Sequence, residues 1–187
     1  MPRAGLTTAI VVREAADLAD EIGYDALTLT ALASRLKVAV PSLYKHVGSL
    51  DDLRRGVALV AIEELTAAMR GAVDEGAGRG SESDLHALAT AYRRYALEHP
   101  GRYAATVRAA PAGDRELRVA SDAAVQVVLD VLETYGLQGD DLVHAARGLR
   151  AALHGFASLE TAGGFGLPQT VERSFEWMVE NFEGGLS

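Results

Sequence analysis

The sequence predicts an all-α protein. Apolar residues recur at spacings of three and four along most of its 187 residues, no stretch sustains an alternation of apolar and polar residues, and no Asn-Gly or Asp-Gly pair marks a hairpin. Hydrophobic residues make up 49% of the chain, which is enough for a packed core. The longest apolar runs, such as residues 57–62, fall far short of the roughly 20 residues that a membrane-spanning helix needs, so we expect no membrane contact.

Three helices are predicted in the first 47 residues, over residues 7–22, 28–36 and 40–47. Gly23 follows the first of them and suits the left-handed conformation that often ends a helix. Thr28 can cap the second helix with its hydroxyl. Pro41 is tolerated in the first turn of the third, because the N–H that proline lacks would be unpaired there.

A long fourth helix is predicted to begin at Ser49, which forms a variant of the capping box with Asp52, and to run towards Val73. The small and polar segment GAGRGSES, residues 76–83, then interrupts the pattern as a linker. Further helices are expected over residues 84–99, 102–109, 117–135, 140–159 and 171–182. We divide the chain into an N-terminal domain, residues 1–56, and a C-terminal domain, residues 57–187, bridged by the long helix.

The net charge of -8 is unevenly distributed along the chain. Residues 1–56 hold seven basic and seven acidic side chains, so the whole negative charge lies downstream of them. Within residues 30–56 five basic side chains face two acidic ones, a local charge of +3. This cluster lies at VAVPSLYKHV, residues 38–47, where hydroxyl, phenol, ammonium and imidazole groups follow one another.

Two helices joined by a tight turn, with a third beside them, form the arrangement in which a helix-turn-helix offers its second helix to the major groove. On the short third helix Leu43 and Val47 are four residues apart and can face inwards. The remaining side chains of this helix are then exposed, and most of them are hydrogen-bond donors suited to phosphate oxygens. The exposed set is Val40, Ser42, Tyr44, Lys45 and His46.

The stretch GYDALTLTALASRLKVAVPSLYKHVGSLDDL resembles the DNA-binding region of the tetracycline-repressor (TetR) family, and the resemblance covers about the first 56 residues. It implies a three-helix DNA-binding domain in front of a helical bundle that binds a ligand and dimerises. It also implies that Ser42 contacts base edges, that Val40 packs against a thymine methyl, and that other side chains approach phosphates. The implied DNA-binding positions are Thr28, Thr30, Lys37, Ala39, Val40, Pro41, Ser42, Tyr44, Lys45 and His46.

Three residues depart from the family pattern. Lys37 stands where the family commonly has glycine in the turn, which would cost roughly 1 to 2 kcal/mol if the backbone is left-handed there. Ala39 replaces the usual serine or threonine cap of the third helix, and Leu50 replaces a lysine that meets phosphate. These departures predict DNA binding that is weaker than is typical and only shallowly dependent on salt.

The C-terminal stretch GLRAALHGFASLETAGGFG resembles a TetR subgroup named for a Trp-His-Gly triplet, with Leu153 in place of the tryptophan. The resemblance implies a homodimer on a palindromic operator, and release of the DNA when a small molecule enters the helical bundle. The resemblance favours a dimer interface for six apolar residues that could instead form only the core within one chain, namely Leu149, Leu153, Phe156, Phe175, Met178 and Phe182. Polar candidates for the ligand site are His86, Tyr92, His99, Tyr103, His144 and His154.

The sequence also bears on functions other than DNA binding. The sequence lacks cysteine, a His-Glu-x-x-His pair, a Gly-x-Ser-x-Gly elbow and a phosphate-cradling loop, so it indicates no metal, no cofactor and no enzyme. His154 and Ser158 place a base and a hydroxyl four residues apart, without an acid to orient them. An all-α bundle enzyme, or a helical adaptor that does not bind DNA, remains the alternative to a cytoplasmic transcriptional repressor.

Overall fold

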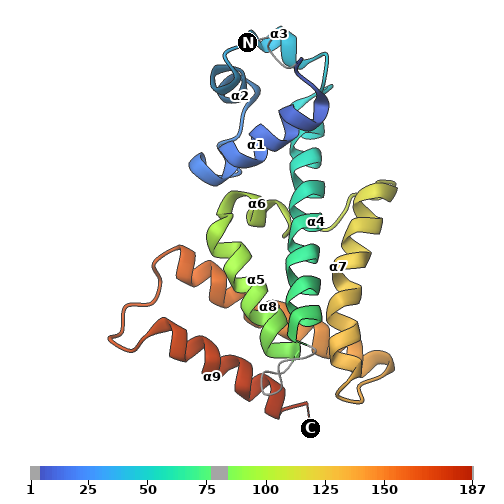
Figure 1. Cartoon of the computed structure of the whole chain (residues 1–187), viewed down its shortest axis with the longest axis vertical. Helices are drawn as coiled ribbons and strands as arrows, with labels where there is room; N and C mark the ends of the chain where they lie inside the picture. The colour runs from blue at the N-terminus through green and yellow to red at the C-terminus, as the bar shows by residue number, and fades with distance from the viewer. Residues whose placement is uncertain (1–4, 77–83, 187) are drawn as a thin grey trace. The chain divides into compact units, whose positions relative to one another are not determined.

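The computed structural model describes residues 5–76 and 84–186, and every regular element in these ranges is an α-helix (Figure 1). The all-α prediction is thereby confirmed. The helices are α1 (Thr8–Ile22), α2 (Leu29–Leu36), α3 (Val40–Leu43), α4 (Leu50–Gly76), α5 (Asp84–Glu98), α6 (Pro100–Ala105), α7 (Arg115–Glu133), α8 (Gly139–Thr161) and α9 (Val171–Gly184). Within the same two ranges, no helix is both long enough and apolar enough to pass through a bilayer.

The described residues fall into two compact units. The first consists of residues 5–64 and 99–120, and the second of residues 65–76, 84–98 and 121–186. Helices α4 and α7 each contribute residues to both units. This grouping differs from the predicted division after residue 56, because the segment His99–Ala120 packs with the N-terminal helices.

The first unit is built around the apolar faces of α1, α2 and α4. Helix α1 begins at the cap Thr7, whose hydroxyl accepts the N–H of Ile10 at 3.2 Å, and it ends at Gly23, where φ is 89°. A glycine is required there because other residues rarely adopt that conformation. Side chains that are completely buried in this core are Val11, Leu27, Leu32, Leu43, Leu53 and Val57.

Helix α6 packs closely against α1 within the first unit. The helix begins at Pro100, in the first-turn position that proline favours, rather than at the predicted residue 102, and it ends at Ala105 rather than near residue 109. The next residue, Gly101, has no Cβ, and a Cβ placed there would overlap the carbonyl group of Ala19 in α1. Glycine at this position therefore permits the contact between the two helices.

The second unit is a bundle in which α5, α8 and α9 pack against one another. Leu85 and Leu88 from α5, Leu149 from α8, and Phe175 and Val179 from α9 are almost completely buried. Arg93 of α5 also enters this bundle. Its guanidinium lies 4.6 Å from the ring centroid of Phe175 and donates two hydrogen bonds of 2.7 Å to Glu160 of α8.

Candidate nucleic-acid interface

Helix α2 is capped at both ends by the local signals of its sequence. The hydroxyl of Thr28 accepts the N–H of Ala31 at 3.1 Å. At the other end the N–H of Val38 reaches the carbonyl of Ala33 at 3.0 Å, and the N–H of Lys37 reaches that of Ser34 at 3.2 Å. This pair of bonds forms a Schellman motif, in which the residue directly after the helix adopts the left-handed conformation.

Lys37 occupies that left-handed position, with φ 55° and ψ 43°. It is the one residue other than glycine with positive φ in the part of the chain that the structure describes. A side chain with a Cβ is disfavoured there by about 1 to 2 kcal/mol relative to glycine. The backbone thus needs the left-handed residue that the family resemblance implied at this turn.

Helix α3 is shorter than its sequence predicts, because it ends at Leu43 instead of continuing to Val47. Its cap, Ala39, provides no side-chain hydrogen bond, as expected from the missing hydroxyl. After the helix, the N–H groups of His46 and Val47 both reach the carbonyl of Leu43, at 2.8 and 3.0 Å. The hydroxyl of Thr8 in α1 donates to the carbonyl of His46 at 3.1 Å, which fixes the turn against the rest of the unit.

The predicted DNA-binding residues all keep solvent-accessible side chains. Leu43 and Val47 are buried, as the inward spacing predicts, and Tyr44 between them is 55% exposed. The exposed members are Thr28, Thr30, Lys37, Ala39, Pro41, Tyr44 and Lys45, and the half-buried ones are Val40, Ser42 and His46. They lie on α2, on α3 and in the turns next to them, and α2 packs against α3.

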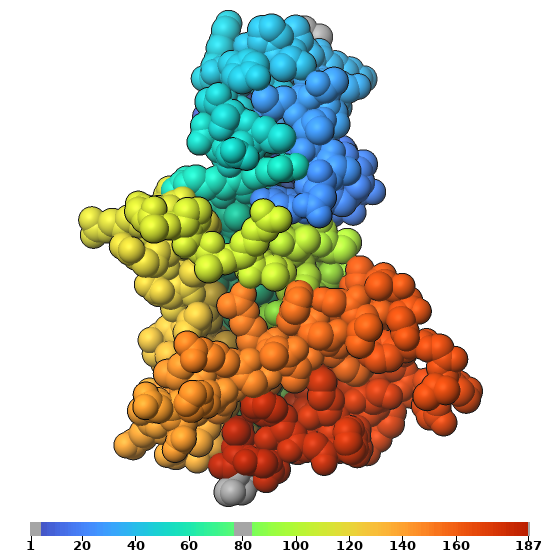
Figure 2. Space-filling model, turned by 180° about the vertical axis from the view of Figure 1, so that it is seen from behind, coloured from blue at the N-terminus to red at the C-terminus, as the bar shows by residue number. Residues whose placement is uncertain are grey.

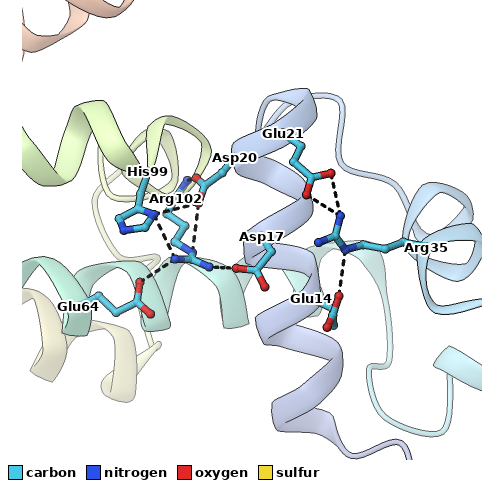
Figure 3. Close-up of polar contacts among 8 residues, drawn as sticks. All are labelled: Glu14, Asp17, Asp20, Glu21, Arg35, Glu64, His99 and Arg102. Atoms are coloured by element: carbon cyan, nitrogen blue, oxygen red, sulfur yellow. Dashed lines mark hydrogen bonds and ion pairs between the residues drawn. The ribbon is translucent and has the colours of Figure 1, made fainter.

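Two arginines of the basic cluster form ion pairs with carboxylates of the same chain. A count of charges along the sequence cannot show these pairs. Arg35 of α2 donates to Glu14 at 2.9 Å and to both carboxylate oxygens of Glu21 at 2.8 Å (Figure 3). These hydrogen bonds, above all those to Glu21, raise the pKa of the Arg35 guanidinium above its ordinary value. Arg55 of α4 binds Asp114 with two nitrogens, because Nε donates to one carboxylate oxygen and Nη2 to the other.

The lysines behave differently from these arginines. Lys37 and Lys45 form no ion pair with any described residue, and both side chains are exposed. The positive charge available to a phosphate backbone near α3 is therefore smaller than the local +3 suggests. The ammonium groups of Lys37 and Lys45 supply it.

The residues expected to bind a ligand are divided between the two units. His99 and Tyr103 belong to the first, where Nδ1 of His99 lies 3.3 Å from a carboxylate oxygen of Asp20 and 3.2 Å from Nη1 of Arg102 (Figure 3). In the second unit Tyr92 is buried, His86 and His154 are half-buried, and His144 is exposed. Their role in ligand binding stays a prediction.

The residues expected at a dimer interface are mostly inside the second unit. Leu149, Leu153, Phe156 and Phe175 are each 9% exposed or less, and the Phe156 and Phe175 rings meet at 5.2 Å between centroids. Their side chains are thus largely covered by their own chain, and their place at a dimer interface stays a prediction. Met178 and Phe182 keep partial exposure.

A groove on the second unit lies next to these core residues. It has a volume of about 660 Å³, and Trp177, which is 61% exposed, is one of the residues that form it. Its lining consists of Phe156, Gln169, Thr170, Arg173, Ser174, Trp177 and Met178. Large apolar side chains are also exposed at the C-terminal end of α8, at Leu159, and in the loop before α9, at Phe165 and Leu167. This loop projects from the second unit in Figure 2.

The candidate catalytic pair has poor geometry for catalysis. Oγ of Ser158 and Nδ1 of His154 are 3.5 Å apart on α8, which is long for a hydrogen bond between a hydroxyl and an imidazole. No group of three or more His, Asp or Glu side chains in residues 5–76 and 84–186 is arranged to hold a metal ion.

Comparison with known proteins finds a matching family for each of the two regions of the chain. The family described as bacterial regulatory proteins, tetR family, matches residues 11–57, and the family described as tetracyclin repressor-like, C-terminal domain, matches residues 85–182. The HTH-type transcriptional regulator Rv0681 of Mycobacterium tuberculosis is 41% identical over 161 residues, which are 86% of this chain and 72% of that protein. The HTH-type transcriptional regulator YobS of Bacillus subtilis is 33% identical over 186 residues, 99% of this chain and 95% of that protein.

A solved structure agrees with the fold. The Streptomyces coelicolor TetR family protein ActR, crystallised in complex with (S)-DNPA, superposes with a TM-score of 0.67 over 98% of each chain, at 21% identity. At 21% sequence identity, this similarity supports the fold alone. The family matches and the two curated relatives show more: the chain belongs to the TetR family of bacterial transcriptional regulators and carries its helix-turn-helix for binding DNA.

Proposed function

We propose that this regulator is a repressor that binds a palindromic operator as a homodimer in the cytoplasm and leaves the DNA when a small molecule binds. The observation that carries the proposal is the surface of α2, α3 and their turns, where Thr28, Tyr44 and Lys45 are exposed on a scaffold anchored by buried leucines. Hydroxyl, phenol and ammonium groups in this arrangement can bind phosphates and leave Ser42 to approach the base edges.

The dimer is supported by the apolar surface of the second unit. Exposed apolar patches of this kind mark interaction sites on proteins that otherwise present polar surfaces. We assign the groove around Trp177 and Met178, together with Leu167, to contact with a second copy of the chain. One short helix reads only part of an operator, so two copies related by a two-fold axis would read both halves of a palindrome.

Release by a small molecule is supported by the fold. The related ActR fold has been crystallised both with (S)-DNPA bound and without a ligand, so a bundle of this architecture can hold a small organic molecule. A ligand can change operator affinity only if it binds the DNA-bound and free conformations with different affinities. The effector of this chain is then a molecule whose addition weakens operator binding by at least several-fold.

The first experiment is selection of DNA from a random pool by the purified full-length chain, followed by sequencing. We expect a palindromic sequence with two half-sites. The double variant Tyr44→Ala/Lys45→Ala should recover no sequence, while Asp122→Asn, at an exposed residue of α7, should recover the same palindrome. Failure of the unmodified chain to enrich any sequence, even at low salt, would refute operator binding.

Light scattering tests the dimer separately. We expect the unmodified chain to have twice the mass of one chain at micromolar concentration, and Trp177→Glu to shift it to the monomer. Val119 is a matched control because it is also apolar and 60% exposed, against 61% for Trp177, but lies on α7. If Val119→Glu and Trp177→Glu behave alike, the groove is not the contact surface.

A further inference from the structure

Arg54 of α4 binds the loop between α1 and α2 and does not pair with a carboxylate among the described residues. Its Nη2 donates to the backbone carbonyl of Asp25 at 3.2 Å and to that of Leu27 at 3.3 Å. Its guanidinium carbon lies 5.8 Å from the ring centroid of Tyr24, within the range of a cation–π contact. The hydroxyl of Tyr24 in turn lies 3.5 Å from the carbonyl of Arg54.

The two carbonyls that Arg54 binds come directly before the start of α2. Leu27 immediately precedes Thr28, the cap of that helix, and its side chain is completely buried. Backbone bonds within the loop use other carbonyls, because the N–H of Ala26 goes to Gly23 and that of Leu27 goes to Tyr24, both at 3.2 Å. Arg54 therefore donates hydrogen bonds to carbonyls that the backbone bonds of the loop leave unused. These carbonyls lie just before Thr28, where α2 begins.

The side chain is poorly placed to bind DNA at the same time. Its Nε is buried and has no hydrogen-bond partner in the part of the chain that the structure describes. Nη2 is shared between two carbonyls, and the guanidinium carbon lies over the ring of Tyr24. An ammonium group could not reproduce this contact, since only the planar guanidinium combines a fork of donors with a face that stacks on an aromatic ring.

From this geometry we propose that Arg54 is a positioning residue for DNA binding. It fixes the start of α2 so that Thr28 and Thr30 reach the DNA backbone, and it makes no contact with DNA itself. The proposal rests on the proposed function, because it presupposes that these two threonines lie at the DNA. The positive charge of Arg54 would suggest a contact with a DNA phosphate, whereas the proposal gives Arg54 a structural role at the start of α2.

The dependence of DNA affinity on salt distinguishes positioning from phosphate contact. Each phosphate neutralised by a side chain adds about 0.9 to the slope of log K against log salt concentration. We expect Arg54→Met, measured on the selected operator by fluorescence anisotropy, to lower affinity about tenfold with an unchanged slope. Lys45→Met is the matched control, with an expected loss of about one unit of slope for each site that contacts the DNA.

Arg54→Lys separates charge from geometry. A role of charge alone would restore binding in this variant, whereas a positioning role predicts affinity close to that of Arg54→Met. Hydrogen exchange of the DNA-free protein gives an independent readout. We expect the N–H of Ala31 in the first turn of α2 to exchange faster in Arg54→Met, while amides in the middle of α1 keep their protection.

Tyr24→Leu tests the same contact without altering a charge, in case Arg54→Met does not fold. This variant should also lose affinity, by about threefold, at an unchanged slope. Affinity equal to that of the unmodified chain in folded Arg54→Met, or in Tyr24→Leu if Arg54→Met is unfolded, would overturn the proposal. So would a slope reduced in Arg54→Met as much as in Lys45→Met. If the unmodified chain selects no operator, the proposed function itself has failed, and faster exchange at Ala31 still decides whether Arg54 positions α2.

Discussion

The carboxylate of Asp20 accepts a hydrogen bond from the backbone N–H of Arg102 at 2.8 Å and so joins the last turn of α1 to the first turn of α6 (Figure 3). The side chain of Arg102 returns to α1 and pairs with Asp17, and its Nη1 lies 3.6 Å from Glu64 of α4. Arg102 is 8% exposed, so most of this charge lies out of water. Its carboxylate partners offset the cost of burying it.

Substitutions of Asp20 separate its two roles. Asp20→Asn keeps an oxygen that can accept the N–H of Arg102 but removes the charge, and we expect a loss of about 1 kcal/mol in the free energy of unfolding. Asp20→Ala removes both and leaves a buried N–H unpaired, which should cost about 2 to 4 kcal/mol. Urea denaturation measures both values, with Asp122→Ala on the exposed side of α7 as a control expected to change little. Equal losses in the two Asp20 variants would show that the hydrogen bond to the backbone contributes nothing.

Gly101 allows the approach of α6 to α1 on which that pairing depends. A Cβ at this position would overlap the Ala19 carbonyl, so Gly101→Ala must push the helices apart, and we expect a loss of about 1 to 3 kcal/mol in the free energy of unfolding. Gly71 is the matched control, because it lies inside α4 and a Cβ there meets nothing within 4 Å. Gly71→Ala should stabilise the chain by about 0.5 to 1 kcal/mol. Stabilisation by both substitutions would contradict the close contact of α6 with α1.

Local signals in the sequence predict most of the helices and several of their ends. Thr28 and Gly23 form the caps that the sequence predicts, and Pro41 lies in the first turn of α3 as expected, because each acts through neighbours within a few residues. The contact of Asp20 with Arg102 joins residues 82 positions apart, and periodicity contains no information about such a pair. This is why the packing of α6 against α1 was not predicted.

The dimer residues show a second limit of sequence patterns. Helical spacing identified Leu149, Leu153 and Phe175 as apolar, but spacing is the same whether a face packs inside one chain or against another. Trp177 lies one residue from Met178 and two from Phe175, is 61% exposed, and is not among the residues that helical spacing predicts for the interface. Exposure, which only the structure provides, separates the two kinds of apolar residue.

Asp114 makes the stability of the first unit sensitive to acid. Its hydrogen bonds with the Arg55 guanidinium, and then with the N–H of Leu117, lower the pKa of its carboxyl from 3.8 to about 2. A carboxyl whose pKa is lower in the folded state stabilises the protein above its unfolded pKa, and this contribution is lost as the pH falls from about 4 towards 2. We therefore expect Asp114→Asn to be less stable than the unmodified chain at pH 7, with the difference shrinking across that interval.

Thermal unfolding between pH 7 and pH 2 measures this difference. Arg55 stays protonated throughout, so Asp114 is the member of the pair that titrates. The control is Asp122→Asn, which replaces an exposed carboxylate of α7 that is not part of the pair with Arg55. A difference for Asp114→Asn that is constant down to pH 2 would contradict the lowered pKa.

The left-handed conformation of Lys37 predicts that its replacement by glycine stabilises the protein while weakening its binding to DNA. Lys37→Gly should raise the free energy of unfolding by about 1 kcal/mol, because glycine adopts φ 55° without steric strain. Lys37→Ala keeps a Cβ and should leave stability nearly unchanged, so it separates the loss of charge from the relief of strain. Both variants remove the same exposed ammonium group and should weaken operator binding equally, with equal reductions in salt slope. Altered binding in Lys37→Gly alone would mean that the strain at this turn, rather than the charge, affects how α3 meets the DNA.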